Sequence, residues 1–294
     1  MEKKSFGRIL KGIGGFYYVD TEEGIVTCRA RGKLRKLGIT PYIGDFVDIS
    51  VQDDNTGYVM EIRERKNLMV RPPVANIDMI AIIASKAPPC TDTYFIDRII
   101  AMATHKNIEV CIVINKCDED VGEELYEIYR NTTAKVFRVS ALSGEGVAEF
   151  REHLSGKLTA LTGNSGVGKS TLINALIPSA QLETGEINRK LGRGRHTTRL
   201  VEILKADEKT WISDTPGFSA FDICAQSEIN AENLAELFAE FEEFSKDCRF
   251  VGCAHIKEDD CAVIDALKAG KIQKSRYESY TKMYSELSVL PKYK

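Results

Sequence analysis

One loop in this sequence combines the residue types that bind phosphate. It follows an apolar run, Leu158 to Thr162, and leads into a segment of helical character, Thr171 to Ile177. Its residues are Gly163, Asn164, Ser165, Gly166, Val167, Gly168, Lys169 and Ser170. Backbone N–H groups of such a loop can surround a phosphate, the lysine can reach the β and γ oxygens, and the serine hydroxyl can bind Mg²⁺. The alternative is a glycine-rich turn that only caps a helix. The strand before the loop and the helix after it favour a nucleoside triphosphate site, which would include Thr171.

A second motif, upstream of this loop, is suited to reading a base. The apolar segment Val110 to Ile114 is a predicted strand, and it runs directly into Asn115, Lys116, Cys117 and Asp118. The Asp118 carboxylate can accept hydrogen bonds from N1–H and from the N2 amino group of guanine, which adenine lacks. Alone, the motif is also compatible with an ordinary turn at a strand end.

Two further segments supply the rest of a guanine nucleotide site. A predicted strand from Lys135 to Val139 ends in the small-residue loop Ser140 to Gly144, where Ser140 and Ala141 would lie behind the base. Downstream of the phosphate loop, another predicted strand leads into Asp214, Thr215, Pro216 and Gly217. Asp214 would hold Mg²⁺ through water, and Gly217 would face the γ-phosphate.

The order of these motifs is rotated relative to that of the usual small GTPase, in which the phosphate loop comes first. The site needs its loops together in space, so a permuted chain order is physically acceptable. On these motifs the sequence resembles the circularly permuted, ribosome small-subunit-dependent GTPases of the RsgA/YjeQ (YloQ) type, over nearly its whole length. The resemblance implies GTP hydrolysis, with GTP or GDP and Mg²⁺ as ligands.

The length and composition of the chain allow several domains. With 294 residues and 43% hydrophobic content, it can form two or three packed cores. No apolar run approaches the roughly 20 residues that cross a bilayer, and no signal-type stretch follows the first residues, so a cytoplasmic protein is expected. The net charge of −3 argues neither for nor against nucleic acid as a partner. The eight cysteines are expected to be reduced.

The amino-terminal part contains short β-rich segments separated by Gly, Asp and Asn. The predicted strands are Gly7 to Ile13, Phe16 to Asp20, Ile25 to Arg29, Phe46 to Val51 and Tyr58 to Ile62. Five strands in about 70 residues predict a small closed barrel, and an OB-fold is both the best interpretation and the one that the resemblance implies. The segment from Arg29 to Lys36 is strongly basic, and it is either a solvated loop or an RNA contact. The aromatic residues Phe16, Tyr17 and Tyr18 offer stacking faces, with at least one expected in the core.

A doubly wound α/β domain is expected after the barrel. The sequence Arg71-Pro72-Pro73 is typical of a linker. Ile77 to Ser85 is an almost continuous apolar strand of the kind found in parallel sheets. Helices are predicted at Tyr94 to Thr104, Gly122 to Arg130 and Val147 to Leu154, alternating with the strands.

The segment Asn188 to Arg199 lies where a GTPase has its first switch. It contains five Lys or Arg residues and no acid. The alternatives are a flexible basic loop without a partner and a loop that becomes ordered around the γ-phosphate. One threonine there normally binds Mg²⁺ through its hydroxyl, and the family pattern favours Thr198 over Thr197.

The water that attacks the γ-phosphate has no standard partner in this chain. A glutamine commonly follows the Asp-x-x-Gly motif and orients this water, but Phe218 occupies that position. Within the switch, His196 is the polar candidate for a catalytic residue, and the resemblance also suggests it. Alternatively, His196 contacts RNA phosphate.

The carboxy-terminal part carries a set of possible metal ligands. Cys248, Cys253, His255 and Cys261 lie within fourteen residues, and three thiols with one imidazole suit tetrahedral Zn²⁺. The alternative is scattered core cysteines, but the neighbourhood is polar. Amphipathic helices are predicted on either side, at Asn230 to Glu243 and Ser275 to Leu287. The resemblance includes the same four ligands, and we expect one structural zinc.

The predicted protein has an OB-fold domain at 1–70 that binds RNA, a circularly permuted P-loop α/β GTPase domain at 71–222 and a helical zinc-binding domain at 223–294. The resemblance implies a monomeric GTP hydrolase that binds the small (30S) ribosomal subunit and its rRNA, assists late maturation and is stimulated by the subunit. The alternative is an rRNA-binding assembly factor for which GTP is mainly a regulatory ligand. Because Asp214 to Gly217 leads into the carboxy-terminal domain, a switch rearrangement could move that domain.

Overall fold

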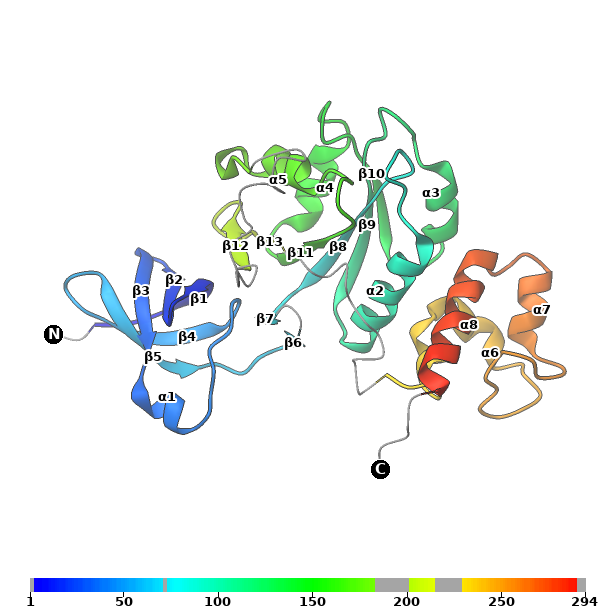
Figure 1. Ribbon diagram of the computed structural model, residues 1–294, viewed down its shortest axis with the longest axis horizontal. Helices are drawn as coiled ribbons and strands as arrows, with labels where there is room; N and C mark the ends of the chain where they lie inside the picture. The colour runs from blue at the N-terminus through cyan, green and yellow to red at the C-terminus, as the bar shows by residue number, and fades with distance from the viewer. Residues whose placement is uncertain (1–2, 71–72, 183–200, 215–228, 290–294) are drawn as a thin grey trace. The chain divides into compact units, whose positions relative to one another are not determined.

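The computed structural model describes residues 3–70, 73–182, 201–214 and 229–289 (Figure 1). The chain divides into two compact units. The first consists of Met1–Met79, Glu149–Thr162 and Ser170–Phe218, and the second of Ile80–Ala148, Gly163–Lys169 and Ser219–Lys294. Of the helices within the described ranges, none has both the length and the apolarity that crossing a bilayer requires.

The amino-terminal part of the first unit is a closed five-stranded barrel. Its strands are β1 (Lys3–Ile13), β2 (Phe16–Thr21), β3 (Gly24–Ala30), β4 (Phe46–Val51) and β5 (Thr56–Ile62). They follow the order β1-β2-β3-β5-β4, and β3 pairs with β5 in parallel. Inward-facing residues such as Ile9, Val19 and Val47 are fully buried and form one core. The five predicted strands and the barrel are therefore confirmed.

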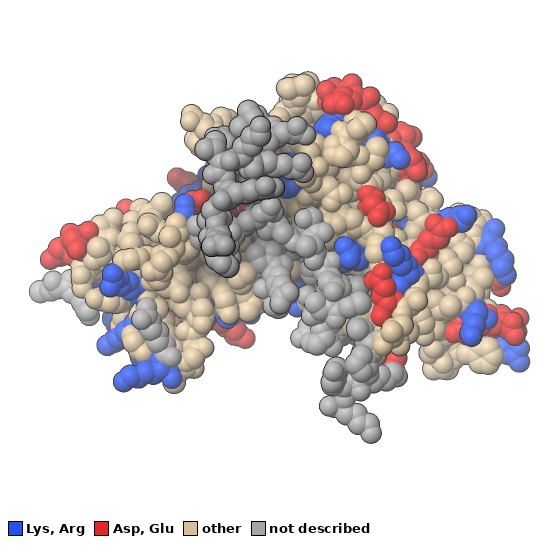
Figure 2. All heavy atoms as spheres, viewed as in Figure 1, with Lys and Arg blue, Asp and Glu red and all other residues tan. Residues whose placement is uncertain are grey.

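The basic segment after β3 is not a simple loop. It contains the short helix α1 (Gly32–Lys36), and Leu34 of this helix is buried in the barrel core. The described basic side chains around it, Arg29, Arg31, Lys33 and Lys36, are exposed. Figure 2 shows Lys and Arg side chains gathered at this end of the barrel. Leu34 thus anchors the exposed basic segment around α1 to the core of the barrel.

The predicted linker is in part a β-hairpin. Strands β6 (Leu68–Val70) and β7 (Pro73–Ala75) pair antiparallel, with Val70 opposite Pro73. The expected linker therefore differs at its end, because Pro73 is the first residue of the short strand β7. A proline has no ladder hydrogen bond to lose at such a position.

A six-stranded sheet follows the barrel in sequence, with the order β10-β9-β8-β11-β13-β12. Its strands are β8 (Met79–Ala84), β9 (Glu109–Ile114), β10 (Lys135–Arg138), β11 (Leu158–Thr162), β12 (Glu202–Lys205) and β13 (Trp211–Asp214). The helices between them are α2 (Thr93–His105), α3 (Glu123–Tyr129), α4 (Val147–Leu154) and α5 (Lys169–Leu176), and a 3₁₀ turn, η1 (Pro178–Ala180), follows α5. All of β8 and β11 is buried, as their apolar sequences predict. The unpredicted strand β12 is only four residues long and runs antiparallel to β13.

Within the first unit, the barrel packs against strands of the sheet. Leu10 of β1 forms a small apolar cluster with Leu158 and Ile203, and Trp211 packs against that cluster. The guanidinium of Arg8 lies between two rings, 4.4 Å from the centre of Phe46 and 4.3 Å from that of Trp211.

The carboxy-terminal part of the second unit is helical but more broken than predicted. Its elements are the 3₁₀ turns η5 (Leu234–Leu237) and η6 (Ala239–Phe241) and the helices α6 (Glu242–Ser245), α7 (Ala262–Lys268) and α8 (Lys274–Ser288). The continuous helix expected over Asn230 to Glu243 is wrong, because Phe238 leaves helical geometry with φ −110° and ψ 88°. The predicted apolar face, Leu234, Leu237, Phe238 and Phe241, is nevertheless buried.

A buried charge network joins this part to α2. The Arg276 guanidinium of α8 donates to Asp97 of α2 at 2.7 Å and to Glu240 at 2.6 Å. The side chains of Arg276 and Asp97 are 2% and 0% exposed. Tyr129 adds a hydrogen bond to Asp97 at 2.8 Å. The carboxy-terminal part and α2 are therefore held together by charges that water does not reach.

Candidate nucleotide and metal sites

The phosphate loop joins β11, which ends at Thr162, to α5, which begins at Lys169. Gly163 lies so close to the carbonyl oxygen of Ile83 that any Cβ would collide with it. The Lys169 ammonium donates to the carbonyl oxygens of Gly163 at 2.7 Å and Asn164 at 3.2 Å. The lysine thus already lies across the loop, on the residues that would surround a phosphate.

A single buried side chain, Asn115, ties the base motifs to the phosphate loop. Its Nδ2 donates to the carbonyl oxygen of Val167 at 2.8 Å, and its Oδ1 accepts from the N–H of Ala141 at 3.0 Å. Asn115 is 2% exposed. A Cβ at Gly168 would collide with the Asn115 amide nitrogen, so the glycine there is a steric requirement. Three predicted motifs that lie far apart in sequence are therefore brought together.

The residues after Asn115 lie in a tight turn at the end of β9. Lys116 has a left-handed backbone, with φ 65°, and its ammonium donates to the carbonyl oxygen of Pro88 at 2.7 Å. The Cys117 N–H donates to the carbonyl oxygen of Val139 at 3.1 Å, and burial raises the pKa of its thiol. Asp118 is exposed. Its contact with guanine stays a prediction.

The Ser140 to Gly144 loop is stabilised by hydrogen bonds between its own residues. The Ser140 hydroxyl accepts from the N–H of Ser143 at 3.1 Å, and its carbonyl oxygen accepts from the N–H of Gly144 at 2.8 Å. Ser140 is fully buried, whereas the side chain of Leu142 is 83% exposed. The hydrogen bonds of Ser140 thus stabilise the loop, and the loop includes the Ala141 N–H that donates to Asn115.

The predicted magnesium residues fall in two groups. Ser170 is half-buried in the first turn of α5, next to Thr171, which was predicted as part of the nucleotide site. Asp214 is the last residue of β13 and lies opposite Leu161 in the parallel ladder with β11. Strands β11 and β13 therefore end at the same edge of the sheet. His196, Thr197, Thr198, Gly217 and Phe218 lie outside the described residues, and their roles stay predictions.

A segment that sequence reasoning missed lies beside the phosphate loop. Pro88 accepts the Lys116 hydrogen bond, and a Cβ at Gly166 would come within 3.1 Å of the Pro89 ring. The two prolines lie in the turn that follows β8, and from the sequence alone only that turn could be predicted. Their contacts with a motif about eighty residues later could not be read from local pattern.

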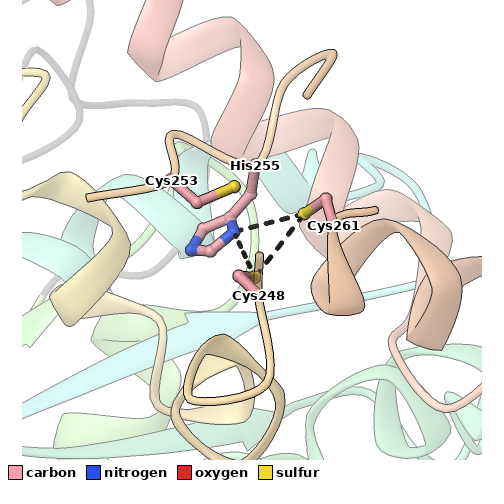
Figure 3. Close-up of side chains that lie close together, drawn as sticks. All are labelled: Cys248, Cys253, His255 and Cys261. Atoms are coloured by element: carbon pink, nitrogen blue, oxygen red, sulfur yellow. Dashed lines mark hydrogen bonds between the residues drawn. The ribbon is translucent and has the colours of Figure 1, made fainter. Parts of the chain in front are cut away.

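The four predicted metal ligands come together in the carboxy-terminal part (Figure 3). Their ligand atoms all lie within 4.8 Å of one another. Cys248 Sγ is 3.9 Å from Cys261 Sγ, and His255 Nδ1 is 3.6 Å and 3.4 Å from these two sulfurs. Ordinary zinc bond lengths in a tetrahedron give about 3.8 Å between sulfurs and about 3.5 Å between sulfur and nitrogen. The geometry and the donor set therefore fit a tetrahedral ion.

The electrostatics of this cluster favour a bound cation. Burial, the hydrogen bond with Cys261 and the charges of Cys261 and Cys248 together raise the pKa of the Cys253 thiol to about 12. Burial lowers the pKa of His255, so its imidazole is neutral and can ligate. Without a metal ion the Cys253 thiol is therefore protonated, and a cation at this site would stabilise the thiolate form that ligates it.

Side chains not predicted from the sequence hydrogen-bond to the backbone around the cluster. The hydroxyl of Tyr277 donates to the carbonyl oxygen of His255 at 2.7 Å, and that of Tyr280 donates to the carbonyl oxygen of Ala254 at 2.6 Å. The Glu258 carboxylate accepts from the N–H groups of Ala254 and Ile256, at 3.0 and 2.8 Å. These contacts hold the His255 backbone in its left-handed conformation, with φ 57°.

The phosphate loop is hydrogen-bonded to an upstream guanine motif, and the strand beside β11 in the sheet ends in an aspartate. These features define a circularly permuted phosphate-loop GTPase. The family model described as RsgA GTPase matches residues 62–224, and that described as RsgA N-terminal domain matches residues 6–59. The chain belongs to the RsgA GTPase family, whose members hydrolyse GTP.

Individual proteins agree with this assignment over nearly full length. The small ribosomal subunit biogenesis GTPase RsgA of Caldanaerobacter subterraneus subsp. tengcongensis is 45% identical over 284 residues, which are 96% of this chain and 95% of that protein. The protein of the same name from Alkaliphilus metalliredigens is 42% identical, with 96% and 98% covered.

Two solved structures have the same fold. YjeQ from Thermotoga maritima has a TM-score of 0.82 and 33% identity, with 98% of this chain and 100% of that chain covered. YloQ, described as a circularly permuted GTPase, has a TM-score of 0.79 and 34% identity, with 99% and 98% covered.

Proposed function

We propose that this chain binds the small ribosomal subunit, hydrolyses GTP there and assists a late step of the subunit's maturation. The observation that carries the GTPase part is the Asn115 side chain, which ties the phosphate loop to both base motifs. The names of the relatives support the partner. Work on ribosomal subunits implies the cytoplasm, and we propose that the protein acts as a monomer.

The nucleotide roles in this proposal follow the motifs. Asp118 reads N1–H and N2 of guanine, with Lys116 and Cys117 beside the base and Ser140 and Ala141 behind it. The N–H groups from Gly163 to Gly168, with Lys169 and Thr171, bind the phosphates. Magnesium would be held by Ser170, Asp214 and Thr198, with Thr197 adjacent, and it would neutralise the β and γ oxygens. Gly217 faces the γ-phosphate, and His196 orients the attacking water.

The same proposal covers the other two parts of the chain. We propose domain limits of 1–70, 71–222 and 223–294. The barrel contacts rRNA through the basic segment around α1, where the Arg29 guanidinium stacks on Phe16 at 4.4 Å while Tyr17 packs into the core. The four ligands Cys248, Cys253, His255 and Cys261 hold one structural zinc, because all four positions of a tetrahedron are filled by the protein.

Base choice can be tested by one substitution. Asp118→Asn converts one acceptor oxygen into a donor, so binding of GTP should weaken and that of xanthosine triphosphate should improve. Titration of fluorescent GTP, XTP and ATP analogues measures this, with Glu119→Gln, a change at the next exposed acid, as the control. Equal affinity of the native chain for ATP and GTP would contradict the assignment.

Turnover with and without purified small subunits tests the function as a whole. We expect slow hydrolysis by the chain alone and strong stimulation by the subunit. The second candidate, an rRNA-binding assembly factor with GTP as a regulatory ligand, is favoured by Phe218 in the place of glutamine. Nucleotide-dependent binding to the subunit without stimulated turnover would select that candidate.

A further inference from the structure

A hollow in the carboxy-terminal part of the second unit adjoins the metal cluster, and the ligands Cys248, Cys253 and His255 are among its lining residues. It has a volume of 830 Å³. We name it the carboxy-terminal groove. Its floor is formed by Phe238, Phe241 and Tyr280, and its walls come from the segment before η5, from α6 and from the loop between Cys248 and Cys253. Volumes of this size hold several side chains of a ligand.

The floor of the groove is aromatic and rigid. The ring of Tyr280 lies edge-on to Phe238 at 5.3 Å and to Phe241 at 5.0 Å, while Phe238 and Phe241 stack at 5.3 Å. The hydroxyl of Tyr280 is held by the carbonyl oxygen of Ala254, next to the ligand His255. These three rings are themselves buried, so they form a rigid support beneath the exposed edge of the groove.

Two apolar side chains stand at the edge of the groove without covering from described residues. Phe250 is 48% exposed, and Val251 is fully exposed. They lie in the loop between two metal ligands, and the ion pair of Arg249 with Asp260 at 2.8 Å steadies this loop. Neighbouring exposed apolar side chains beside a hollow are typical of an interaction surface.

The charges around the groove decide the kind of partner. Glu232, Glu236 and Glu242 line it and are exposed, against one lysine, Lys246, which already pairs with Glu242 at 3.5 Å. The negative excess repels nucleic acid phosphate and attracts lysine and arginine.

We propose that the carboxy-terminal groove binds a short segment of a basic protein, in which an apolar or aromatic side chain packs on Phe250 and Val251 and flanking Lys or Arg residues meet the three glutamates. This inference rests on the proposed function in one respect: if the chain acts on the small subunit, the basic segments belong to proteins of that subunit. The groove would thus give the carboxy-terminal part a protein contact, separate from the RNA contact proposed for the barrel.

The proposal can be tested with the full chain and defined probes. The ligand is a fluorescein-labelled synthetic peptide of alternating Arg, Lys and Leu, compared with a peptide in which Glu replaces the basic residues and with a single-stranded RNA of similar length. Fluorescence anisotropy should show salt-sensitive binding of the basic peptide and none of the acidic one. The double variant Glu232→Gln, Glu236→Gln should weaken peptide binding roughly tenfold, and so should Val251→Ser.

A matched control lies one position from the groove. Glu243 is an equally exposed acid of α6 that does not line it, so Glu243→Gln should leave binding unchanged. Tighter binding of the RNA than of the basic peptide, with loss in the same variants, would identify an RNA surface and overturn the proposal. It would also be overturned by peptide binding that is indifferent to the groove variants, by no peptide binding at all, or by self-association that these variants abolish.

Turnover with small subunits, measured in the same variants, separates this inference from the proposed function. Absence of subunit-stimulated hydrolysis in the native chain would refute the proposed function while peptide binding stayed measurable. Peptide binding that fails while hydrolysis is stimulated normally would refute the groove alone.

Discussion

Asn115 is the residue on which the nucleotide site depends most. Its amide makes two hydrogen bonds inside the protein, to Val167 and Ala141, and it is buried. Asn115→Ala leaves a buried carbonyl oxygen and a buried N–H without partners, at about 1–3 kcal/mol each. We expect loss of GTP affinity by about a hundredfold or more and a lower free energy of unfolding, measured by nucleotide titration and urea denaturation.

Asn115→Asp is the matched control for that change. The carboxylate keeps an acceptor for Ala141 N–H but has no donor for the Val167 carbonyl oxygen. We expect the loss of GTP affinity to be at least comparable with that of Asn115→Ala, because a carboxylate oxygen then faces the Val167 carbonyl oxygen. A native GTP affinity in Asn115→Ala would show that the backbone alone holds the loops together.

The metal cluster gives a second prediction at this scale. Cys253→Ala removes one of four ligands, so the purified variant should retain less than one zinc per chain, and thermal unfolding of the carboxy-terminal part should come earlier. Metal analysis and near-ultraviolet circular dichroism measure these effects. Cys90→Ala, at an exposed cysteine far from the cluster in sequence, is the control. A native chain without metal under reducing conditions would refute the assignment.

At the scale of elements, buried charge joins α8 to α2. Arg276→Met removes a guanidinium that pairs with Asp97 and Glu240 and leaves Asp97 buried without its cation. We expect a loss of about 3–5 kcal/mol in the free energy of unfolding, measured by denaturant titration. Lys268→Met breaks an exposed pair with Asp265, where both side chains are more than 60% exposed, and should change the stability by less than about 1 kcal/mol. Similar effects of the two changes would contradict a structural role for the buried network.

Arg8 shows a buried charge of a different kind. Its guanidinium lies between Phe46 and Trp211, and its Nε and Nη1 have no hydrogen-bond partner among the described residues. Burial lowers the pKa of Arg8 to about 10. Between that value and the higher, ordinary pKa of an arginine the unfolded chain binds more protons, so stability should rise with pH in that window.

The same residue gives a test at neutral pH. Arg8→Met keeps the packing between the rings and removes the desolvated charge, so the free energy of unfolding should change by less than about 1 kcal/mol. Arg8→Ala leaves a gap between the rings and should lose about 2–3 kcal/mol. Chemical denaturation of the three proteins measures both. Equal losses in the two variants would mean that the charge itself stabilises the junction.

Elements with strong local patterns were predictable, and those decided by distant contacts were not. The apolar run of β8 and the periodic spacing of α2 gave correct elements. The segment Asn230 to Glu243 has helical periodicity, yet packing of Phe238 against Tyr280 breaks it into 3₁₀ turns. Likewise, the motifs predicted that the Asn115 turn and the phosphate loop belong to one site, but Pro88 and Pro89 at the phosphate loop and Glu258 at the metal cluster contribute through contacts that no local pattern encodes.

For the whole molecule, the resemblance and Phe218 lead to a prediction about activation. Without a glutamine, His196 in a basic segment must place the water, and rRNA phosphates would fix that segment. His196→Ala should keep GTP and subunit binding yet lose most of the subunit-stimulated rate. Removing the charges of Arg193 and Arg195 should weaken activation in a salt-sensitive way. If the subunit stimulated hydrolysis by His196→Ala as strongly as hydrolysis by the native chain, a group other than His196 would position the attacking water.

The buried Arg276 network changes what a switch could move. Because α8 is joined to Asp97, any displacement of the carboxy-terminal part carries α2 with it. Helix α2 leads into β9, at whose end Asn115 lies. A displacement of the carboxy-terminal part would therefore affect the base-reading loop as well as the metal cluster.

The Asn115 hydrogen bond to Val167 also has a consequence for the nascent chain. Its two residues are 52 positions apart, and the base-reading loop is translated first. At about 5–20 residues per second, roughly 3–10 s pass before the phosphate loop exists to receive the Asn115 amide. During that time guanine nucleotide cannot stabilise the growing polypeptide, so the barrel and the four strands β8 to β11 depend on their own packing until the ribosome has made the partner.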